Sequence, residues 1–246
     1  MRVLGVGVDL VDMDAAVALV AAAAQPRPGR TPLQVVTLNP EMVMRARRDP
    51  VLAAIIEDAG LVVPDGIGVV LAMRRRGHPT ACRVTGTDLL QSYAPHARAL
   101  GHRVALVGGA PGVAERAAAE LVRRHPGLLV VAADGGDPGP ATVERLRSVA
   151  PDVVFAAYGA GRQEGFLAGH LATIGAGVGM GVGGALDFLA GRVPRAPTAV
   201  RSAGLEWAWR LGRQPWRARR QTALPVFWWL DRREAASLRS LRGPGR

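Results

Sequence analysis

Short apolar segments alternate with helix-length segments along most of the chain, and this alternation limits the possible folds more than any other feature. Helix-starting signals stand between the apolar segments: Asp49-Pro50 and Pro111 each precede a helical pattern, and Gly60 ends the first of these. This arrangement favours a Rossmann-like α/β fold, in which helices cover both faces of a mostly parallel sheet. Strands are expected at residues 3–8, 34–38, 61–63, 104–107, 128–131, 153–157 and 178–182.

Polar and glycine residues cluster where the expected strands end. In parallel α/β sheets, ligands bind at the carboxyl ends of the strands, where loops meet the N-termini of helices. The sequence therefore predicts a site at this edge of the sheet. Its candidate residues are Thr37, Asn39, Asp65, Gly108, Gly109, Gln163 and Asp187.

Asp65 stands between Pro64 and Gly66, directly after an apolar strand. An aspartate in this position is compatible with the N-cap of a following helix. It is equally placed to act as a general base that takes a proton from an attacking hydroxyl group, a role that needs one carboxylate and no metal. The residue pattern alone leaves both interpretations open.

Two further motifs have a functional and a purely structural interpretation. Gly108 and Gly109 lie between a strand and a helix, where backbone N–H groups could hold a diphosphate, but a glycine-rich turn without a ligand has the same pattern. Asp12-Met13-Asp14 imitates a metal-binding D-x-D motif, yet it precedes an alanine-rich helical segment that acidic residues would cap. The histidines show no metal-ligand spacing, so we predict no metal site and no cofactor.

Positive charge is concentrated at the C-terminal end. Residues 192–246 hold 13 arginines against three acidic residues, and they contain all five tryptophans of the chain. Trp beside Arg is typical of segments at a membrane interface, because indole rings favour the headgroup level and guanidinium groups pair with phosphate. We expect a catalytic α/β domain at 1–193 and a basic, helical, membrane-associating appendage at 194–246.

The remaining composition points to the cytoplasm. Cys82 is the only cysteine, so no intramolecular disulfide can form. The N-terminal apolar run meets Asp9 too early for a signal peptide, and the longest apolar runs fall short of the roughly 20 residues that span a bilayer. We therefore expect a cytoplasmic protein that is peripheral at the inner face of the cell membrane.

Seven sequence blocks, taken in order, resemble the WecG/TagA/CpsF glycosyltransferases. The resemblance covers roughly residues 3–230. The blocks are TLNPEMV at 37–43, VPDGIGVV at 63–70, RVTGTDLL at 83–90, ALVGGAPGVAE at 105–115, YGAGRQE at 158–164, GVGGALDFLAGRVPRAP at 181–197 and GLEWAWRL at 204–211.

This resemblance implies an inverting, metal-independent transfer from a UDP-sugar to an undecaprenyl-diphosphate-linked N-acetylglucosamine. The donor would carry N-acetylmannosamine or a related N-acetylhexosamine or uronate, and the product would serve cell-surface polysaccharide or teichoic acid synthesis. Asp65 matches the family's proposed base, and the polar residues of the reaction site match Thr37, Asn39, Arg83 and Gln163.

The resemblance also assigns roles to binding residues. Asp187 matches a position near the uracil base, and Gly108 and Gly109 match the loop beside the diphosphate. In the tail, the arginines expected at the diphosphate or the membrane are Arg210, Arg217 and Arg220. The expected partners are thus the UDP-sugar, the lipid-linked acceptor and an anionic membrane surface; a homo-oligomer stays open.

Two other classes of protein fit parts of the sequence. A nucleic-acid-binding α/β protein would explain the basic tail, but not the ordered polar residues at the strand ends. A nicotinamide-dependent oxidoreductase would need the glycine fingerprint G-x-G-x-x-G, which the loop at 108–112 lacks. We therefore expect no nucleic acid as a partner.

Overall fold

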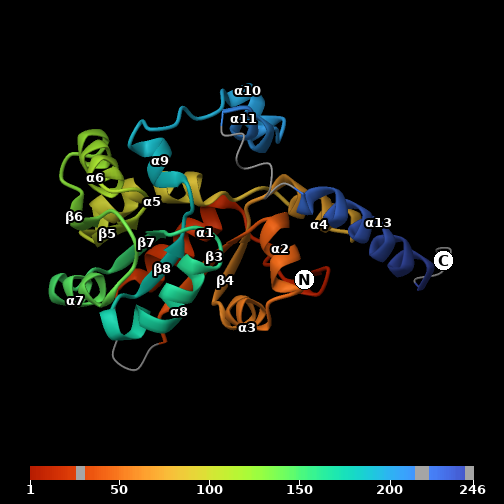
Figure 1. Cartoon of the computed structure of the whole chain (residues 1–246), viewed down its shortest axis with the longest axis horizontal. Helices are drawn as coiled ribbons and strands as arrows, with labels where there is room; N and C mark the ends of the chain where they lie inside the picture. Colours follow the sequence, from red (N-terminus) through yellow and green to blue (C-terminus); the bar gives the residue numbers. More distant parts are fainter. Residues whose placement is uncertain (26–30, 214–221, 242–246) are drawn as a thin grey trace.

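The computed structural model describes residues 1–25, 31–213 and 222–241 and contains a six-stranded parallel sheet (Figure 1). The strand order is β4-β3-β8-β7-β5-β6, and every neighbouring pair is parallel. Six of the seven expected strands are confirmed. Their bounds are β3 Leu33–Leu38, β4 Leu61–Pro64, β5 Arg103–Gly108, β6 Leu129–Asp134, β7 Val153–Ala157 and β8 Val178–Gly181.

Helices pack on both faces of this sheet, as the α/β pattern predicts. One face is covered by α1 (Met13–Ala24), α5 (Gly86–Leu100), α6 (Val113–Arg124) and α9 (Ala185–Leu189). The other carries α7 (Pro140–Val149) and α8 (Arg162–Ile174), with α2 (Pro40–Ala46), α3 (Pro50–Asp58) and α4 (Ile67–Arg75) at its β3–β4 end. Successive strand residues point to opposite faces, so Val35 packs with α1 and α5 whereas Val36 packs with α2 and α3.

The prediction of a strand at residues 3–8 is wrong. This segment forms a small antiparallel hairpin apart from the main sheet, with β1 at Arg2–Val3 and β2 at Val6–Gly7. Leu4 and Gly5 make the turn, with φ angles of 51° and 86°, so the apolar run reverses direction instead of continuing. Its valines are nevertheless buried against α2, α3 and α4.

The helix-starting signals are confirmed at two positions and wrong at a third. The Asp12 carboxylate accepts a hydrogen bond of 2.8 Å from the Ala15 backbone N–H, so it caps α1, and Asp49 caps α3 in the same way. Pro111 does not open α6. That helix begins at Val113, after Gly112 has turned the chain with a φ of 77°.

The helical C-terminal segment is confirmed, and part of it packs into the core. It contains α10 (Thr198–Ser202), α11 (Glu206–Arg213) and α13 (Ala223–Leu241), the last of which extends beyond α4 in Figure 1. Phe227 of α13 is fully buried among α2 and α4 side chains. Asp231, also fully buried, forms ion pairs with Arg75 and Arg76, so α13 is joined to the core by apolar and ionic contacts.

We predict that Asp231→Ala destabilises the protein by about 3 kcal/mol, because it removes the fully buried carboxylate that pairs with Arg75 and Arg76 and leaves the buried guanidinium group of Arg76 with Glu234 as its remaining partner. Urea unfolding of the purified protein measures the change. Glu120→Ala, which removes a carboxylate from an exposed arginine pair on α6, should leave the midpoint nearly unchanged. Equal midpoints for Asp231→Ala and the parent would contradict this role.

Candidate active site

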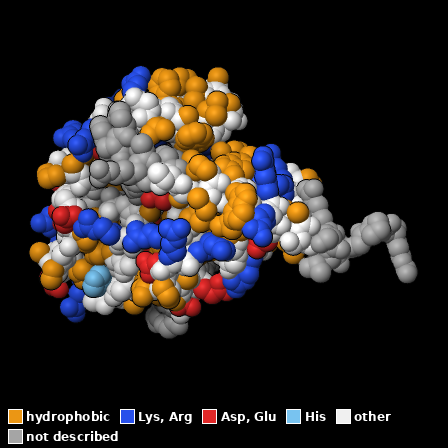
Figure 2. Space-filling view, turned by 45° about the vertical axis from the view of Figure 1, so that its right-hand side comes forward, with side chains coloured by type: hydrophobic (Ala, Val, Ile, Leu, Met, Phe, Trp, Pro, Cys, Tyr) orange, Lys and Arg blue, Asp and Glu red, His pale blue; other side chains and the backbone are white. Residues whose placement is uncertain are grey.

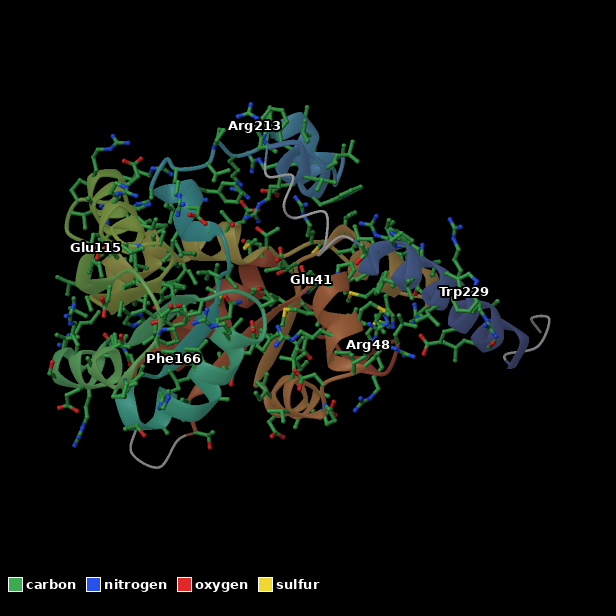
Figure 3. All side chains as sticks on the ribbon, in the orientation of Figure 1. Glu41, Arg48, Glu115, Phe166, Arg213 and Trp229 are labelled. Atoms are coloured by element: carbon green, nitrogen blue, oxygen red, sulfur yellow. The ribbon has the colours of Figure 1, made fainter. Side chains whose placement is uncertain are left out.

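Two adjoining cavities lie at the carboxyl ends of the strands, below α11. Their volumes are about 240 and 350 Å³. Figure 3 shows Glu41, which lines both cavities, at the start of α2. The residues common to both linings are Asn39, Glu41, Asp65, Thr85, Glu206 and Arg210.

The two cavities differ in chemistry. The smaller one, hereafter the apolar cavity, has Ile67, Trp207, Leu224 and Trp228 in its walls, from α4, α11 and α13. The larger one, hereafter the polar cavity, is walled by the strand-end loops and lined by polar side chains that include Thr37, Thr87, Gln163 and Asp187. A polar ligand and a partly apolar ligand can thus meet at the shared residues.

Asp65 lies at this junction, directly after β4. Its backbone N–H donates to the Leu38 carbonyl over 2.9 Å, which fixes the loop against the end of β3. The N-cap position of α4 is Gly66 and not Asp65, so the N-cap interpretation of this aspartate is wrong. The carboxyl group therefore faces the cavities without a helix-capping role.

The electrostatic surroundings of Asp65 favour its protonated form. Burial raises the pKa of its carboxyl group from 3.8 to about 7. Arg83 acts against this shift, as Arg210 does more weakly, whereas Glu206 and Asp88 add to it. A carboxyl group with a pKa near 7 can both accept and release a proton at neutral pH.

Close packing holds the Asp65 loop in place. A Cβ atom on Gly66 would lie 2.5 Å from Pro40 Cδ and 3.1 Å from Asn39 Cβ, so only glycine fits there. Gly68, the second residue of α4, lies against Pro40 and against the ring of Phe227 from α13. The position of Asp65 consequently depends on α2 and on α13 as well as on the sheet.

Thr37 and Asn39 line the cavities and also hold the local backbone. The Thr37 hydroxyl donates to the Gly181 carbonyl over 3.0 Å, which links β3 to β8. The Asn39 side-chain oxygen accepts from the Met42 N–H and caps α2. Both residues come to the site as the sequence predicts, next to Asp65.

Gln163 is buried and connects two loops of the polar cavity. Its Oε1 atom accepts from the Gly183 N–H over 3.1 Å, and its Nε2 atom donates to Glu164. Glu164 in turn accepts from the Gly161 N–H and holds the turn before α8. Asp187 lines the same cavity, with its carboxylate 3.6 Å from Arg192.

Gly108 and Gly109 stand apart from both cavity linings. Both have positive φ angles, and a Cβ atom on Gly108 would lie 2.8 Å from the Ala157 carbonyl carbon. The Gly109 N–H donates to the Ala157 carbonyl. These contacts give the two glycines a packing role between β5 and β7, and their place beside a diphosphate stays a prediction.

Charged residues from the C-terminal segment complete the site. Arg83 lines the apolar cavity, whereas Arg210 lines both cavities, and the Arg210 guanidinium group lies 4.8 Å from the ring centre of Phe188. Glu206 lies between Arg83 and Arg195, and Asp88 pairs with Arg195. Arg217 and Arg220 lie outside the described residues.

The residue pattern did not single out Glu41, Thr85, Asp88, Arg195 or Glu206 as site residues. Four of them lie inside sequence blocks that carried the family resemblance, at 37–43, 83–90 and 181–197. Glu206, in the block at 204–211, is the fifth. Their presence in those blocks was the one available signal.

Comparison with known proteins identifies the family of this chain. Residues 1–241 match the model of the "Glycosyl transferase WecG/TagA/CpsF family". An N-acetylglucosaminyldiphosphoundecaprenol N-acetyl-beta-D-mannosaminyltransferase of Bacillus spizizenii is 32% identical over 195 residues, which are 78% of this chain and 76% of that protein. The Staphylococcus aureus protein of the same name is 32% identical over 197 residues, covering 79% and 78%. The chain is thus a glycosyltransferase and belongs to the WecG/TagA/CpsF family.

Proposed function

We propose that this protein transfers N-acetylmannosamine, or a related N-acetylhexosamine or uronate, from a UDP-sugar to undecaprenyl-diphosphate-linked N-acetylglucosamine, with inversion. The observation that carries this proposal is the place of Asp65, a carboxyl group with a pKa of about 7 where a polar and an apolar cavity meet. The names of the relatives support the choice of sugar and acceptor. The product would enter cell-surface polysaccharide or teichoic acid synthesis.

The two substrates would occupy the two cavities. The polar cavity takes the UDP-sugar, because its loops offer backbone and side-chain groups to a sugar and a nucleotide, with Asp187 near the uracil base. The apolar cavity takes the acceptor sugar and the start of its lipid, against Trp207 and Trp228. Asp65 would then lie between the acceptor hydroxyl and the donor.

The reaction needs a base on one side of the sugar and a positive charge on the other. The acceptor oxygen attacks the anomeric carbon, its proton passes to Asp65, and the bond from that carbon to the UDP oxygen breaks. Arg210, which lines the polar cavity, would neutralise the charge that develops on the diphosphate, with Arg217 and Arg220 as further candidates, while Arg83 stays beside the base. Such stabilisation can be worth about 3 to 4 kcal/mol for each donor, and it needs no metal ion.

We predict that Asp65→Asn lowers turnover about 10²-fold or more, because the amide cannot take the proton. The measurement is product mass after incubation with UDP-N-acetylmannosamine and a short-chain lipid-diphosphate-N-acetylglucosamine, in buffer that contains EDTA. In the parent protein, kcat/KM should rise with pH through a midpoint near 7, as Asp65 loses its proton. Near-parental turnover of the variant would exclude Asp65 as the base.

The same variant has a built-in control for folding. The folded-state pKa of Asp65 lies above its unfolded value, so its contribution to stability is present at low pH and is lost as the pH rises through about 7. At pH 8 the ionised carboxylate opposes folding, and Asp65→Asn should unfold at or above the parental temperature. Lost activity then cannot be assigned to unfolding.

The C-terminal helices would place the enzyme on the membrane that holds its acceptor. Within the described residues, no helix combines the length and apolarity needed to span a bilayer. Trp207 on α11 and Trp229 on α13 are 41% and 56% exposed, and Arg233 lies over the Trp229 ring. Figure 2 shows hydrophobic side chains gathered beside arginines on this side of the molecule. We infer peripheral binding to anionic lipid at the inner face of the cytoplasmic membrane.

We predict that the double variant Trp229→Ala with Arg233→Ala binds vesicles of anionic phosphatidylglycerol at least about fivefold more weakly than the parent. The loss of one arginine near an anionic surface costs about 1 kcal/mol, and the loss of the indole adds to this. Co-sedimentation at low and high salt measures the binding. The matched control is Leu129→Ala with Arg123→Ala, an exposed pair on β6 and α6. Equal weakening by both pairs would contradict docking through α13.

A further inference from the structure

Helix α11 crosses the junction of the two cavities and brings two charged side chains to it. Glu206 and Arg210 are four residues apart, so they lie on the same face of the helix, and both line both cavities. On this described helix every residue keeps some exposure to solvent, and Trp207 is on the exposed side. No described residue of α11 is fully buried, so this helix has less apolar anchoring than α13, which buries Phe227.

Ionic contacts connect α11 to the core instead. The Glu206 side chain is only 14% exposed; its Oε1 atom lies 3.5 Å from Arg195 Nε and its Oε2 atom lies 3.9 Å from Arg83 Nη1. Arg195 reaches on to Asp88, at 2.7 Å, in the first turn of α5. Arg201, from α10, lies 3.8 Å from the same carboxylate.

Glu206 is the member of this chain of charges that lies on α11 and also pairs with Arg83, which lines the apolar cavity together with Asp65. Arg83 is also fixed by a hydrogen bond of 3.0 Å from its Nη2 atom to the Arg201 carbonyl, so the same segment holds it from two sides. We propose that Glu206 is a positioning residue for the transfer reaction: it holds Arg83 beside Asp65 and keeps α11, with Arg210, over both cavities. This inference rests on the proposed function.

The charge of Glu206 has a second effect at the site. Arg83 alone would favour the ionised carboxylate and so weaken Asp65 as a base, whereas Glu206 opposes Arg83 and raises the Asp65 pKa. One carboxylate therefore pairs with the cation beside Asp65 and preserves the basicity of Asp65. Neither effect requires Glu206 to touch a reacting atom.

The test is Glu206→Gln, which keeps the size and the hydrogen-bonding capacity of the side chain and removes its charge. The hydrogen bond from Arg83 to the Arg201 carbonyl remains in this variant and keeps Arg83 near Asp65, so that loss of the negative charge lowers the Asp65 pKa. The acid limb of the pH profile, which is the fall of kcat/KM at low pH, should therefore move to lower pH. For each protein, kcat/KM at pH 6 is divided by the plateau value that the same protein reaches at high pH. This ratio should be about twofold or more higher in the variant than in the parent. Amide hydrogen exchange, read by mass spectrometry, should become faster in peptides from 206–213.

Controls separate this role from general loosening of the protein. Glu120→Gln, which uncouples two arginines on α6, should leave the pH profile and the exchange of α11 as in the parent. Glu206→Asp should restore part of the acid-limb position, because it restores the charge. The proposal is overturned if Glu206→Gln leaves either the acid limb or the exchange of α11 unchanged.

The proposed function can fail separately. If Asp65→Asn keeps parental turnover, the base is another residue, and the acid limb of the pH profile does not report the ionisation of Asp65. The exchange of α11 then decides alone whether Glu206 holds this helix over the cavities. Faster exchange supports that role, and parental exchange overturns it.

Discussion

The rest of the site depends on one constraint: the carboxyl group of Asp65, directly after β4, is kept largely away from water. Pairing of β3 with β4 brings Leu38 opposite Pro64, and the Asp65 N–H then bonds to the Leu38 carbonyl. Burial raises the pKa of the carboxyl group, and the nearby arginines prevent a larger rise. An ionised aspartate in this place opposes folding and therefore lowers the free energy of unfolding at neutral pH. The same burial gives a group that can exchange protons at neutral pH.

The C-terminal segment has two parts with different physical roles. Helix α13 is fastened to the core by Phe227 and by the buried ion pairs of Asp231, and the same Phe227 ring packs on Gly68, close to the Asp65 loop. Helix α11 has no fully buried residue and is connected to the core through the ion pairs of Glu206. Deleting everything after residue 193 would therefore uncover core side chains as well as remove a membrane surface, and single substitutions separate these effects better. The boundary proposed at 193/194 stays a prediction.

Local patterns in the sequence were sufficient for the sheet and for the edge that carries the site. Apolar runs predicted β3 to β8, and polar residues after those runs predicted the position of Asp65, Thr37 and Asn39. The prediction of a strand from the first apolar run was wrong, because Leu4 and Gly5 have positive φ angles and turn the run into a hairpin. No glycine pattern marks Leu4 as such a position. The pairing of Glu206 with Arg83 and Arg195 could not be predicted from the sequence, because it depends on how distant segments meet in space.

The central claim is that Asp65 is a carboxyl group whose burial at the junction of the two cavities makes it a base at neutral pH. The most direct measurement is a titration of its side-chain carboxyl carbon by NMR in protein labelled with 13C-aspartate. The signal is assigned by its loss in Asp65→Asn. A midpoint near pH 7 is the result this account predicts. A midpoint near 3.8, the ordinary value for aspartate, would contradict it.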